Sequence, residues 1–482
     1  MNGEFSHGRT RAVFLPEVRN NAIPDAIDTV SMKKSLLLIT LLFADAWPAA
    51  AQAWRAPTTM KRLPNGLTIV VSEDHSAPTF GLCVSYGVGF RLEPKGRTGF
   101  AHLFEHMMFE GTPKAPKGTF DRVLEGGGGN NNGDTRYDFT EYIAAAPLAA
   151  LDPLLWLEAD RMTTLDFSTD NLENQRKVVE EEVRVNVLNQ PYGAFEWLDL
   201  PEKAFDTYPN SHNFYGDFGD LDGAKIEDVR TFFEQYYVPK NAVLAIVGDV
   251  NPDDVFARVE KYFGPVSSRV PPPHPSVVES PQAGERHFEQ EDQLAKLPAL
   301  AIGYRMPERR TRDAIVGAVT GELLLNGEAS LLYQALVKTS QVATSVSGGV
   351  NWPLGNPFEF NGPTLLTTMV IYPGSMSEQR VVVAFDSVIN VLASRGPTSA
   401  QVKRIAAKMR SDWYDQLETP MSRASLLSHA VLFDGTFESV YTIPEQVATV
   451  TPGEVRAFAA KYLVKSNRTV INRVPAKTGG AK

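Results

Sequence analysis

The chain has 482 residues, of which 43% are hydrophobic and 22% are charged, and its formal net charge is −10 at pH 7. A chain of this length exceeds what a single core supports, so we expect two or more domains. The composition is that of an ordinary soluble globular protein. The negative charge argues against nucleic acid as a partner, because there is no basic surplus to neutralise phosphates.

The N-terminal region has the order of features that is typical of a secretory signal peptide. Lys33 and Lys34 precede a short apolar run, and small-residue cleavage patterns follow at residues 49–53. The run is too short to span a membrane, and a buried helix is the alternative interpretation. We assign residues 32–53 to a signal peptide and residues 1–31 to a dispensable or non-native extension. We therefore expect a periplasmic protein with no membrane span in the mature chain.

Strand and helix patterns alternate after this region. Residues 67–74 and 80–89 are strand-like, and residues 139–146 form a further candidate strand. Residues 98–110 and 170–189 are expected to be helical. This mixture predicts an α+β fold, in which helices pack on one face of a sheet. Cys83 is the single cysteine, so it forms no internal disulfide, and we expect it in the core.

The first helical segment contains the motif H-x-x-E-H, formed by His102, Glu105 and His106. On a helix, positions i and i+4 lie on one face, so the two imidazoles are placed to bind one tetrahedral zinc ion. Zinc lowers the pKa of a bound water, and Glu105 is placed to take its proton as general base. The alternative is a pair of core histidines, which is costly because an acid would be buried between them without a metal.

The segment 125–135 is rich in glycine and asparagine and is open to several interpretations. It lacks the lysine and the helix start of a phosphate-binding loop. A calcium loop is conceivable from its Asn and Asp content, but no glutamate stands at the EF-hand spacing. Taken alone, the segment is best interpreted as a glycine-rich turn.

A zinc ion needs a third protein ligand, and the second helical segment offers three consecutive glutamates. Glu180 and Glu181 lie near basic residues at helical spacing, which predicts an ion-paired, solvated surface. Glu182 follows Val178 and Val179 on the apolar stripe, where a carboxylate must find a metal or a donor. We therefore predict Glu182 as the ligand, with Glu181 as the weaker alternative.

Two segments of the chain align without gaps at a distance of 226 residues. They are residues 228–249 and 454–475, and each reads as a helix, a turn and an apolar strand. A shared segment at the end of each half indicates a duplicated domain. We predict two α/β sandwich domains at 54–269 and 286–482, joined by the proline-rich linker 270–285.

Four segments resemble, in order, successive signatures of the pitrilysin/insulinase family of inverted zinc peptidases. This family includes the mitochondrial processing peptidase and half-length bacterial relatives, and the resemblance covers nearly all of residues 60–475. The four segments are residues 98–112, 126–142, 174–193 and 236–250.

The resemblance implies a zinc endopeptidase with one zinc ion per chain, which cleaves unfolded peptides in a chamber formed with a second chain. The interval of 76 residues between His106 and Glu182 matches the family's third ligand. Asn132 matches an asparagine that opens an edge strand, and Asp134 and Thr135 extend that strand. In the family this strand pairs with the substrate backbone. Many relatives have a glutamate where this chain has Gln175.

The second half departs from the family at two places. Many relatives carry an arginine and a tyrosine that contact substrate, and Leu331 and Thr344 stand at the corresponding positions. Leucine cannot donate a hydrogen bond. Either the pair has drifted, or a related two-domain subunit supplies it in a heterodimer; a homodimer is less favoured. The rival function is a non-catalytic structural or assembly subunit of a processing-peptidase-like complex.

Overall fold

The computed structural model describes residues 54–476 of the chain. The predicted extension and signal peptide, residues 1–53, lie outside the described residues, as do residues 477–482. Within the described range, no helix is long and apolar enough to cross a membrane.

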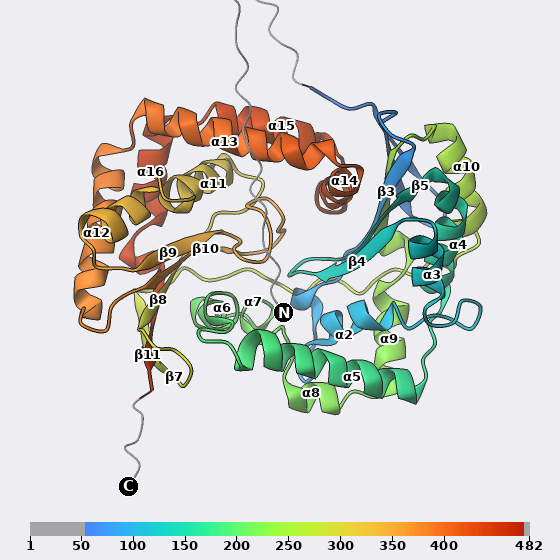
Figure 1. The fold of residues 1–482 in the computed structure, drawn as a ribbon, viewed down its shortest axis with the longest axis horizontal. Helices are drawn as coiled ribbons and strands as arrows, with labels where there is room; N and C mark the ends of the chain where they lie inside the picture. Colours follow the sequence, from blue (N-terminus) through green and yellow to red (C-terminus); the bar gives the residue numbers. More distant parts are fainter. Residues whose placement is uncertain (1–53, 477–482) are drawn as a thin grey trace, which may run out of the picture. The chain divides into compact units, whose positions relative to one another are not determined.

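The first half of the described chain forms a six-stranded sheet (Figure 1) with the strand order β1-β2-β6-β3-β5-β4. Neighbouring strands are antiparallel except β2 and β6, which run parallel. The strands predicted at residues 67–74, 80–89 and 139–146 are β2, β3 and β5. The bounds are β1 Thr58–Arg62, β2 Thr68–Glu73, β3 Thr79–Tyr86, β4 Asn130–Thr135, β5 Thr140–Pro147 and β6 Ala242–Gly248.

The second half forms a five-stranded sheet with the order β7-β11-β8-β10-β9. Its one parallel pair is β7 with β11, and its other neighbours are antiparallel. Apart from the additional β1, this order and these directions repeat those of the first sheet. The bounds are β7 Arg286–Asp292, β8 Ala299–Arg305, β9 Ser345–Val350, β10 Leu365–Ile371 and β11 Arg468–Pro475.

The two aligned sequence segments have the same local structure. In the first, helix α9 leads through a 3₁₀ turn into β6, and in the second, helix α16 leads through a 3₁₀ turn into β11. Asn241 Nδ2 donates to the carbonyl of Tyr236 at 2.9 Å, and Asn467 Nδ2 donates to the carbonyl of Tyr462 at 2.8 Å. The matched asparagines therefore tie each strand to the end of its preceding helix.

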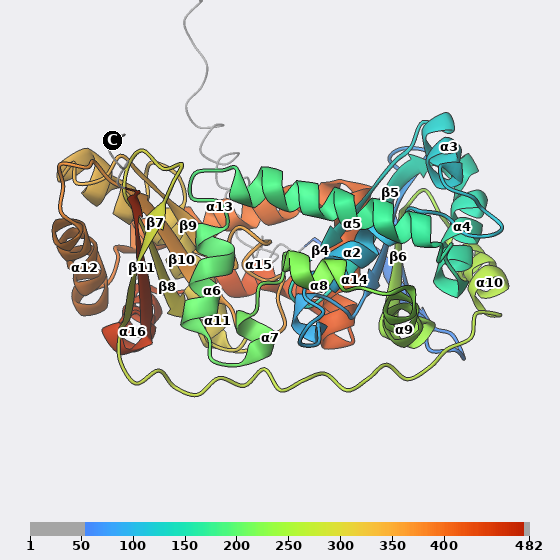
Figure 2. The ribbon, with the colours of Figure 1, turned by 90° about the horizontal axis from the view of Figure 1, so that it is seen from below.

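The helices predicted at residues 98–110 and 170–189 are α2 and α5, and α5 continues as a π-helical turn, Arg184–Leu188. The first-half helices are α2 Phe100–Met107, α3 Thr119–Gly126, α4 Leu151–Thr163, α5 Thr169–Val183, α6 Leu200–Ala204, α7 Tyr208–Ser211, α8 Phe218–Asp222, α9 Ile226–Tyr236 and α10 Pro252–Phe263. The second-half helices are α11 Arg312–Leu325, α12 Glu378–Arg395, α13 Ser399–Glu418, α14 Pro420–Asp434, α15 Glu438–Ala448 and α16 Pro452–Tyr462. Between α10 and β7 the chain is extended, and residues 270–285 contain no helix or strand (Figure 2).

Strand β6 is buried on both faces, so other parts of the chain pack against both faces of the first sheet. Leu244 and Ile246 belong to a core that also includes Leu103 and Phe104 of α2. Val243 and Ala245 alternate with them and join a core built mainly from the second half. The predicted α+β architecture is confirmed, with the addition that the sheets are not left open on their second face.

The second cover of the first sheet is α14, which belongs to the second half of the chain. Figure 1 shows α14 on the side of the sheet opposite to α4 and α10. It lies so close to β3 that a Cβ atom on Gly81 would be 2.4 Å from the backbone of Pro420 and Met421. Glycine at position 81 is what permits this approach.

The second sheet receives the reciprocal cover from the first half. Phe195, Leu200 and Ala204 are buried against Ala301 of β8 and Ile471 of β11. A Cβ atom on Gly303 of β8 would be 3.0 Å from the Leu200 side chain. Each half therefore contributes helical segments to the sheet of the other.

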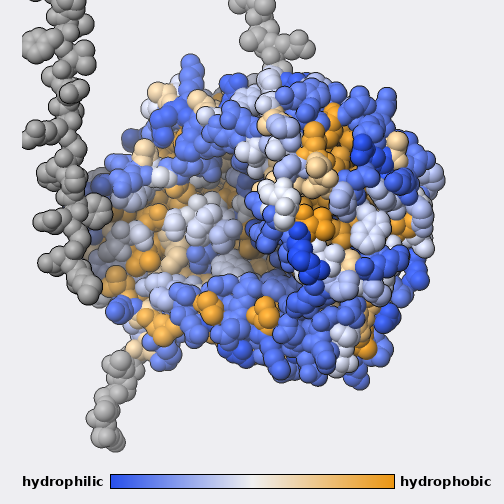
Figure 3. All heavy atoms as spheres, turned by 45° about the vertical axis from the view of Figure 1, so that its right-hand side comes forward, coloured by the Kyte–Doolittle hydropathy of each residue, from blue (hydrophilic) through white to orange (hydrophobic). Residues whose placement is uncertain are grey.

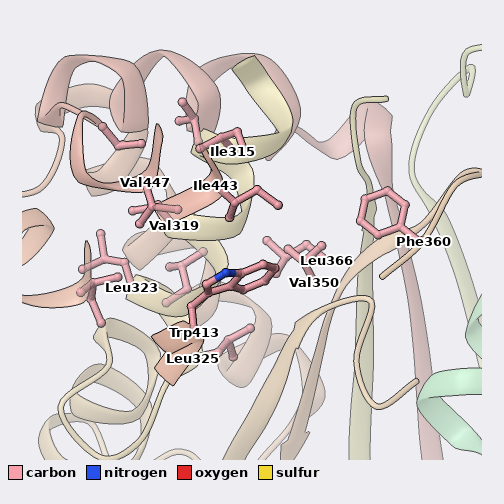
Figure 4. Packing of buried hydrophobic residues seen from close by; sticks show 14 of the residues in the cluster. Ile315, Val319, Leu323, Leu325, Val350, Phe360, Leu366, Trp413, Ile443 and Val447 are labelled. Carbon is pink, nitrogen blue, oxygen red and sulfur yellow. The ribbon is translucent and has the colours of Figure 1, made fainter. Parts of the chain in front are cut away.

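The opposite face of the second sheet carries a large apolar core (Figure 4). Val319 and Leu323 of α11, Leu366 of β10 and Ile443 of α15 belong to it. The indole of Trp413 is buried there and donates to the carbonyl of Val440 at 2.9 Å, which satisfies its single donor.

The contact at Gly81 generates a stability prediction. We expect Gly81→Ala to lower the free energy of unfolding by about 1–3 kcal/mol, the usual effect of overpacking a core, because backbone atoms cannot move aside. Gly126→Ala is the matched control, because a Cβ atom there meets nothing within 4 Å. Urea denaturation of both variants measures the effect. Equal midpoints for the two variants would contradict the tight contact between α14 and β3.

Candidate functional site

Helix α2 presents the H-x-x-E-H motif along one edge, because its other side is apolar. Phe100, Leu103, Phe104 and Met107 are buried at the i, i+3, i+4, i+7 spacing of an amphipathic helix. The helix start is fixed by the buried carboxylate of Glu93, which accepts hydrogen bonds from the backbone N–H groups of Gly99 (3.1 Å) and Ala101 (2.8 Å). The motif therefore sits on a helix whose rotation and starting point are both determined.

His102, His106 and Glu182 come together as the sequence predicted, with their candidate ligand atoms within 4.8 Å of one another. The two Nε2 atoms are 3.3 Å apart, and the Glu182 oxygens lie 3.6 Å from His102 Nε2 and 3.4 Å from His106 Nε2. A tetrahedron with bonds of about 2.0–2.2 Å, as for zinc with nitrogen and oxygen ligands, has edges of roughly 3.3–3.6 Å. The donor atoms therefore fit one zinc ion.

The neighbouring glutamates do not join this cluster. Glu181 is 65% exposed and pairs with Arg184 at 3.4 Å. Glu180 pairs with the same guanidinium at 2.9 Å. Glu182 is 34% exposed, and its pKa is lowered to about 2, chiefly by the hydrogen bond with His106. It is therefore ionised at neutral pH, as a metal ligand must be.

Gln175 fixes the tautomer of His106. The Gln175 amide nitrogen donates to the Glu110 carboxylate, which also pairs with Lys117. A carboxylate accepts only, so the amide oxygen must face His106 Nδ1, 3.3 Å away. His106 then carries its proton on Nδ1 and leaves the Nε2 lone pair for a metal. The Gln175 amide therefore orients the His106 ring.

The surroundings of His102 and His106 shift their pKa values in opposite directions. Burial and the nearby His106 lower the pKa of His102 to about 4, so its imidazole is neutral at pH 7. Burial alone would lower the pKa of His106, but Glu182 outweighs it and raises that pKa. Metal binding would have to displace this proton.

The hydroxyl of Tyr215 donates to Glu182 Oε1 at 2.8 Å, a contact that no spacing in the sequence indicated.

Glu105 lies under the edge strand of the sheet. Thr135 Oγ1 donates to Glu105 Oε2 at 2.6 Å. Burial raises the pKa of Glu105, while the Thr135 hydrogen bond opposes that rise. A Cβ atom on Gly133 would be 2.9 Å from Glu105 Cγ, so glycine is needed to leave room for this carboxylate. A carboxyl group with a raised pKa and a fixed rotamer is suited to accept and return a proton.

The glycine-rich segment divides into a turn and the strand β4. In the described sheet β4 is the last strand and pairs only with β5, so its other edge is free for hydrogen bonding. Asn132 is exposed and Asp134 is half-buried beside Arg136 at 2.6 Å. Burial raises the pKa of Asp134 to about 7. Thr135 is buried, and its side chain is committed to Glu105.

A second group of potential metal ligands lies close together, but its side chains bond to one another and leave no central position for an ion. Cys83, Glu141 and His429 are buried between β3, β5 and α14. Glu141 Oε2 is itself the centre of the cluster, because it accepts from Cys83 (3.1 Å) and Ser425 (2.8 Å) and lies 3.1 Å from His429 Nε2. Burial would lower the pKa of His429, but Glu141 and Glu359 raise it to about 10. This cluster is a buried polar network that joins the two halves.

The two departures predicted in the second half lie at the surface of its fold. Leu331 packs partly against the second-half core. Thr344 is exposed and donates to the carbonyl of Ile371 at 3.1 Å. It precedes β9, the edge strand at the same place in its sheet as β4. Neither side chain offers a cationic or phenolic donor.

Models of two known families match the chain. The model described as Insulinase (Peptidase family M16) matches residues 68–212, and the model described as Peptidase M16 inactive domain matches residues 224–409. Together they cover strands β2 to β10, while β1 and β11 lie outside the matched ranges.

Individual proteins agree with this match. The zinc protease PqqE of Helicobacter pylori is 31% identical over 313 residues, which cover 64% of this chain and 69% of that protein. The mitochondrial-processing peptidase subunit beta of Caenorhabditis elegans is 28% identical over 207 residues, 43% of this chain and 44% of that protein. The crystal structure of a protease from Helicobacter pylori has the same fold, with a TM-score of 0.81 and 24% identity over 88% of this chain and 100% of that chain. The chain therefore belongs to peptidase family M16, the insulinase family.

Proposed function

We propose that the chain is a zinc-dependent endopeptidase that binds one zinc ion through His102, His106 and Glu182. The observation that carries this proposal is the approach of two imidazole nitrogens to 3.3 Å beside an ionised carboxylate. Three donor atoms at this spacing converge on one point, as the protein ligands of a tetrahedral zinc ion do. The relative PqqE is named a zinc protease, which supports the choice of metal and reaction.

The residues around the ion have separate roles in hydrolysis. When bound, zinc polarises a peptide carbonyl and lowers the pKa of a water molecule. Glu105 accepts the proton of the attacking water and passes it to the leaving amine. Thr135 holds the Glu105 carboxylate in one orientation through its hydrogen bond.

The free edge of β4 gives the substrate its place. An extended peptide adds to this edge as a further strand, with Asn132 exposed within β4, two residues after its start at Asn130, and Asp134 and Thr135 continuing the ladder. Backbone pairing of this kind selects an extended conformation over a particular sequence, which favours unfolded peptides as substrates. The predicted signal peptide at residues 32–53 supports a periplasmic location for this reaction.

We also propose that a related two-domain subunit completes the site. Val178, Val185 and Leu188 are exposed at helical spacing along the helix that carries Glu182. Apolar side chains gathered beside a site indicate a surface that a partner or substrate covers. Figure 3 shows a hollow on one face of the molecule with apolar residues on its walls and a hydrophilic rim. The relative from Caenorhabditis elegans is named as a subunit.

The ligand assignment predicts the effect of two isosteric substitutions. Glu182→Gln should weaken zinc binding at least tenfold, because it removes a charged ligand. Glu181→Gln should leave zinc binding unchanged, because Glu181 faces Arg184 and solvent. Metal analysis and chelator competition on the purified proteins measure both. Similar losses from the two substitutions would contradict the assignment, and absence of zinc from the wild type would favour a non-catalytic subunit.

The role of Glu105 predicts a loss of turnover without a loss of metal. We expect Glu105→Gln to lower kcat about a hundredfold or more while zinc stays bound, because a carboxamide accepts no proton. Thr135→Val should have a milder effect, since it removes a hydrogen bond that lowers the pKa of Glu105. That pKa then rises further, and the acidic limb of the kcat/KM profile moves to higher pH. Near-normal turnover in zinc-loaded Glu105→Gln would refute this mechanism.

The absent donor pair predicts that the isolated chain is a slow peptidase. Loss of one oxyanion donor costs about a hundred- to a thousandfold in rate. We therefore expect a large gain from a related subunit, and a partial gain from Leu331→Arg combined with Thr344→Tyr. The matched control is Val383→Arg with Val391→Tyr, which introduces the same side chains at exposed positions of α12. Full activity of the wild-type chain alone, with no gain from any partner, would defeat the proposal.

A further inference from the structure

The two histidines of the site are held in unequal ways. His106 is oriented by the hydrogen bond from its Nδ1 to Gln175. His102 Nδ1 is buried and has no hydrogen-bond partner among the described residues. Metal-binding histidines usually donate their second ring N–H to an acceptor that fixes the ring plane. Some other contact must therefore fix the ring of His102.

Tyr215 provides that contact through its ring. The Tyr215 and His102 rings are stacked, with centroids 5.2 Å apart and planes inclined by 14°. Trp197 meets Tyr215 edge-on, at 5.0 Å and 83°. Tyr215 is 9% exposed, so it lies enclosed between the indole and the imidazole. A ring confined in this way restricts rotation of its stacked neighbour.

The hydroxyl of the same residue determines the position of a second ligand. It lies 2.8 Å from Glu182 Oε1 and 3.1 Å from Asn186 Nδ2. The Asn186 amide nitrogen is a donor, so the phenol accepts from it and its own proton must point to the carboxylate. One lone pair of Glu182 Oε1 is thereby occupied, while Oε2 faces His106 Nε2 at 3.4 Å.

We infer that Tyr215 is a positioning residue for the metal site, which holds the His102 imidazole with its ring and the Glu182 carboxylate with its hydroxyl. The inference rests on the proposed zinc site. Tyr215 makes up for the missing acceptor on His102, and with Gln175 it orients all three ligands. It touches the ligands and not the reacting atoms, so it acts through them.

Two substitutions separate the contributions of the ring and the hydroxyl. Tyr215→Phe removes the hydroxyl and keeps the stacking, so we expect zinc affinity to fall about tenfold. Tyr215→Leu removes both, and we expect a fall of about a hundredfold, the upper end for an orienting partner of a metal ligand. Chelator competition measures both affinities. Tyr262→Phe is the matched control. The Tyr262 hydroxyl also donates to a carboxylate, that of Asp152, at a distance of 2.7 Å, but neither residue contacts a candidate metal ligand.

A double-mutant cycle tests the route through Glu182. In the Glu182→Gln background, Tyr215→Phe should lower zinc affinity much less than in the wild type, because the charged acceptor is already gone. In the peptidase assay, the loss in Tyr215→Phe should be recovered by saturating zinc, which a general folding defect would not allow.

The outcomes distinguish this inference from the proposed function. Unchanged zinc affinity in both folded variants overturns the role of Tyr215 while leaving the zinc site in place. A loss in Tyr215→Leu alone overturns the role of the hydroxyl. If Tyr215→Leu does not fold, Tyr215→Phe alone decides that role. A wild type that binds no zinc overturns the proposed function itself.

Discussion

Each sheet is buried on both faces because each half of the chain sends helical elements onto the sheet of the other half. Helix α14 crosses to the first sheet, where Gly81 permits backbone contact, and the segment around Leu200 crosses to the second. Apolar burial on this scale is the main favourable term in folding. It also removes the freedom of either half to turn independently, since a sheet that lost its exchanged cover would expose alternate residues of β6 or β8 to water.

The helix that carries the proposed third ligand is connected to this exchange. Helix α5 carries Glu182 and then runs through its π-helical turn to Tyr192, whose backbone N–H donates to Asp292 of the second sheet at 2.9 Å. A few residues later Phe195 is fully buried in the same sheet's core. The chain that carries Glu182 thus contacts the first half before this residue, at Val179, and the second half after it, at Tyr192 and Phe195. His102 and His106 lie on α2, which belongs entirely to the first-half core. The segment that follows Glu182 is therefore anchored in the second half, while the three candidate ligands themselves lie on helices of the first half.

Buried carboxylates around the site are each given a donor, and the donors give them different tasks. Glu93 accepts backbone N–H groups and starts α2, Glu110 orients Gln175, and Glu105 is held by Thr135. Unpaired, any of them would be costly to bury in charged form. Glu182 differs in having a low pKa and a partly exposed side chain, as expected for the group that meets a cation. One residue type thus serves as helix cap and as orienting partner, and is proposed as base and as ligand, according to its neighbours.

The sequence by itself determined the parts of this protein that depend on local spacing. Helical periodicity placed His102, Glu105 and His106 on one edge of α2, and the repeated segments indicated two similar sheets. The spacing from the buried Val179 distinguished Glu182 from Glu181, but Val178, which was expected on the same apolar stripe, is exposed. Only the tertiary structure decided which residues complete the site. Tyr215 reaches His102 and Glu182 across more than thirty positions, and Thr135 turns its hydroxyl to Glu105, so neither contact leaves a periodic trace. The exchange of α14 and α6 was equally invisible, because an apolar helix face and an apolar strand show that they will be buried but not against what.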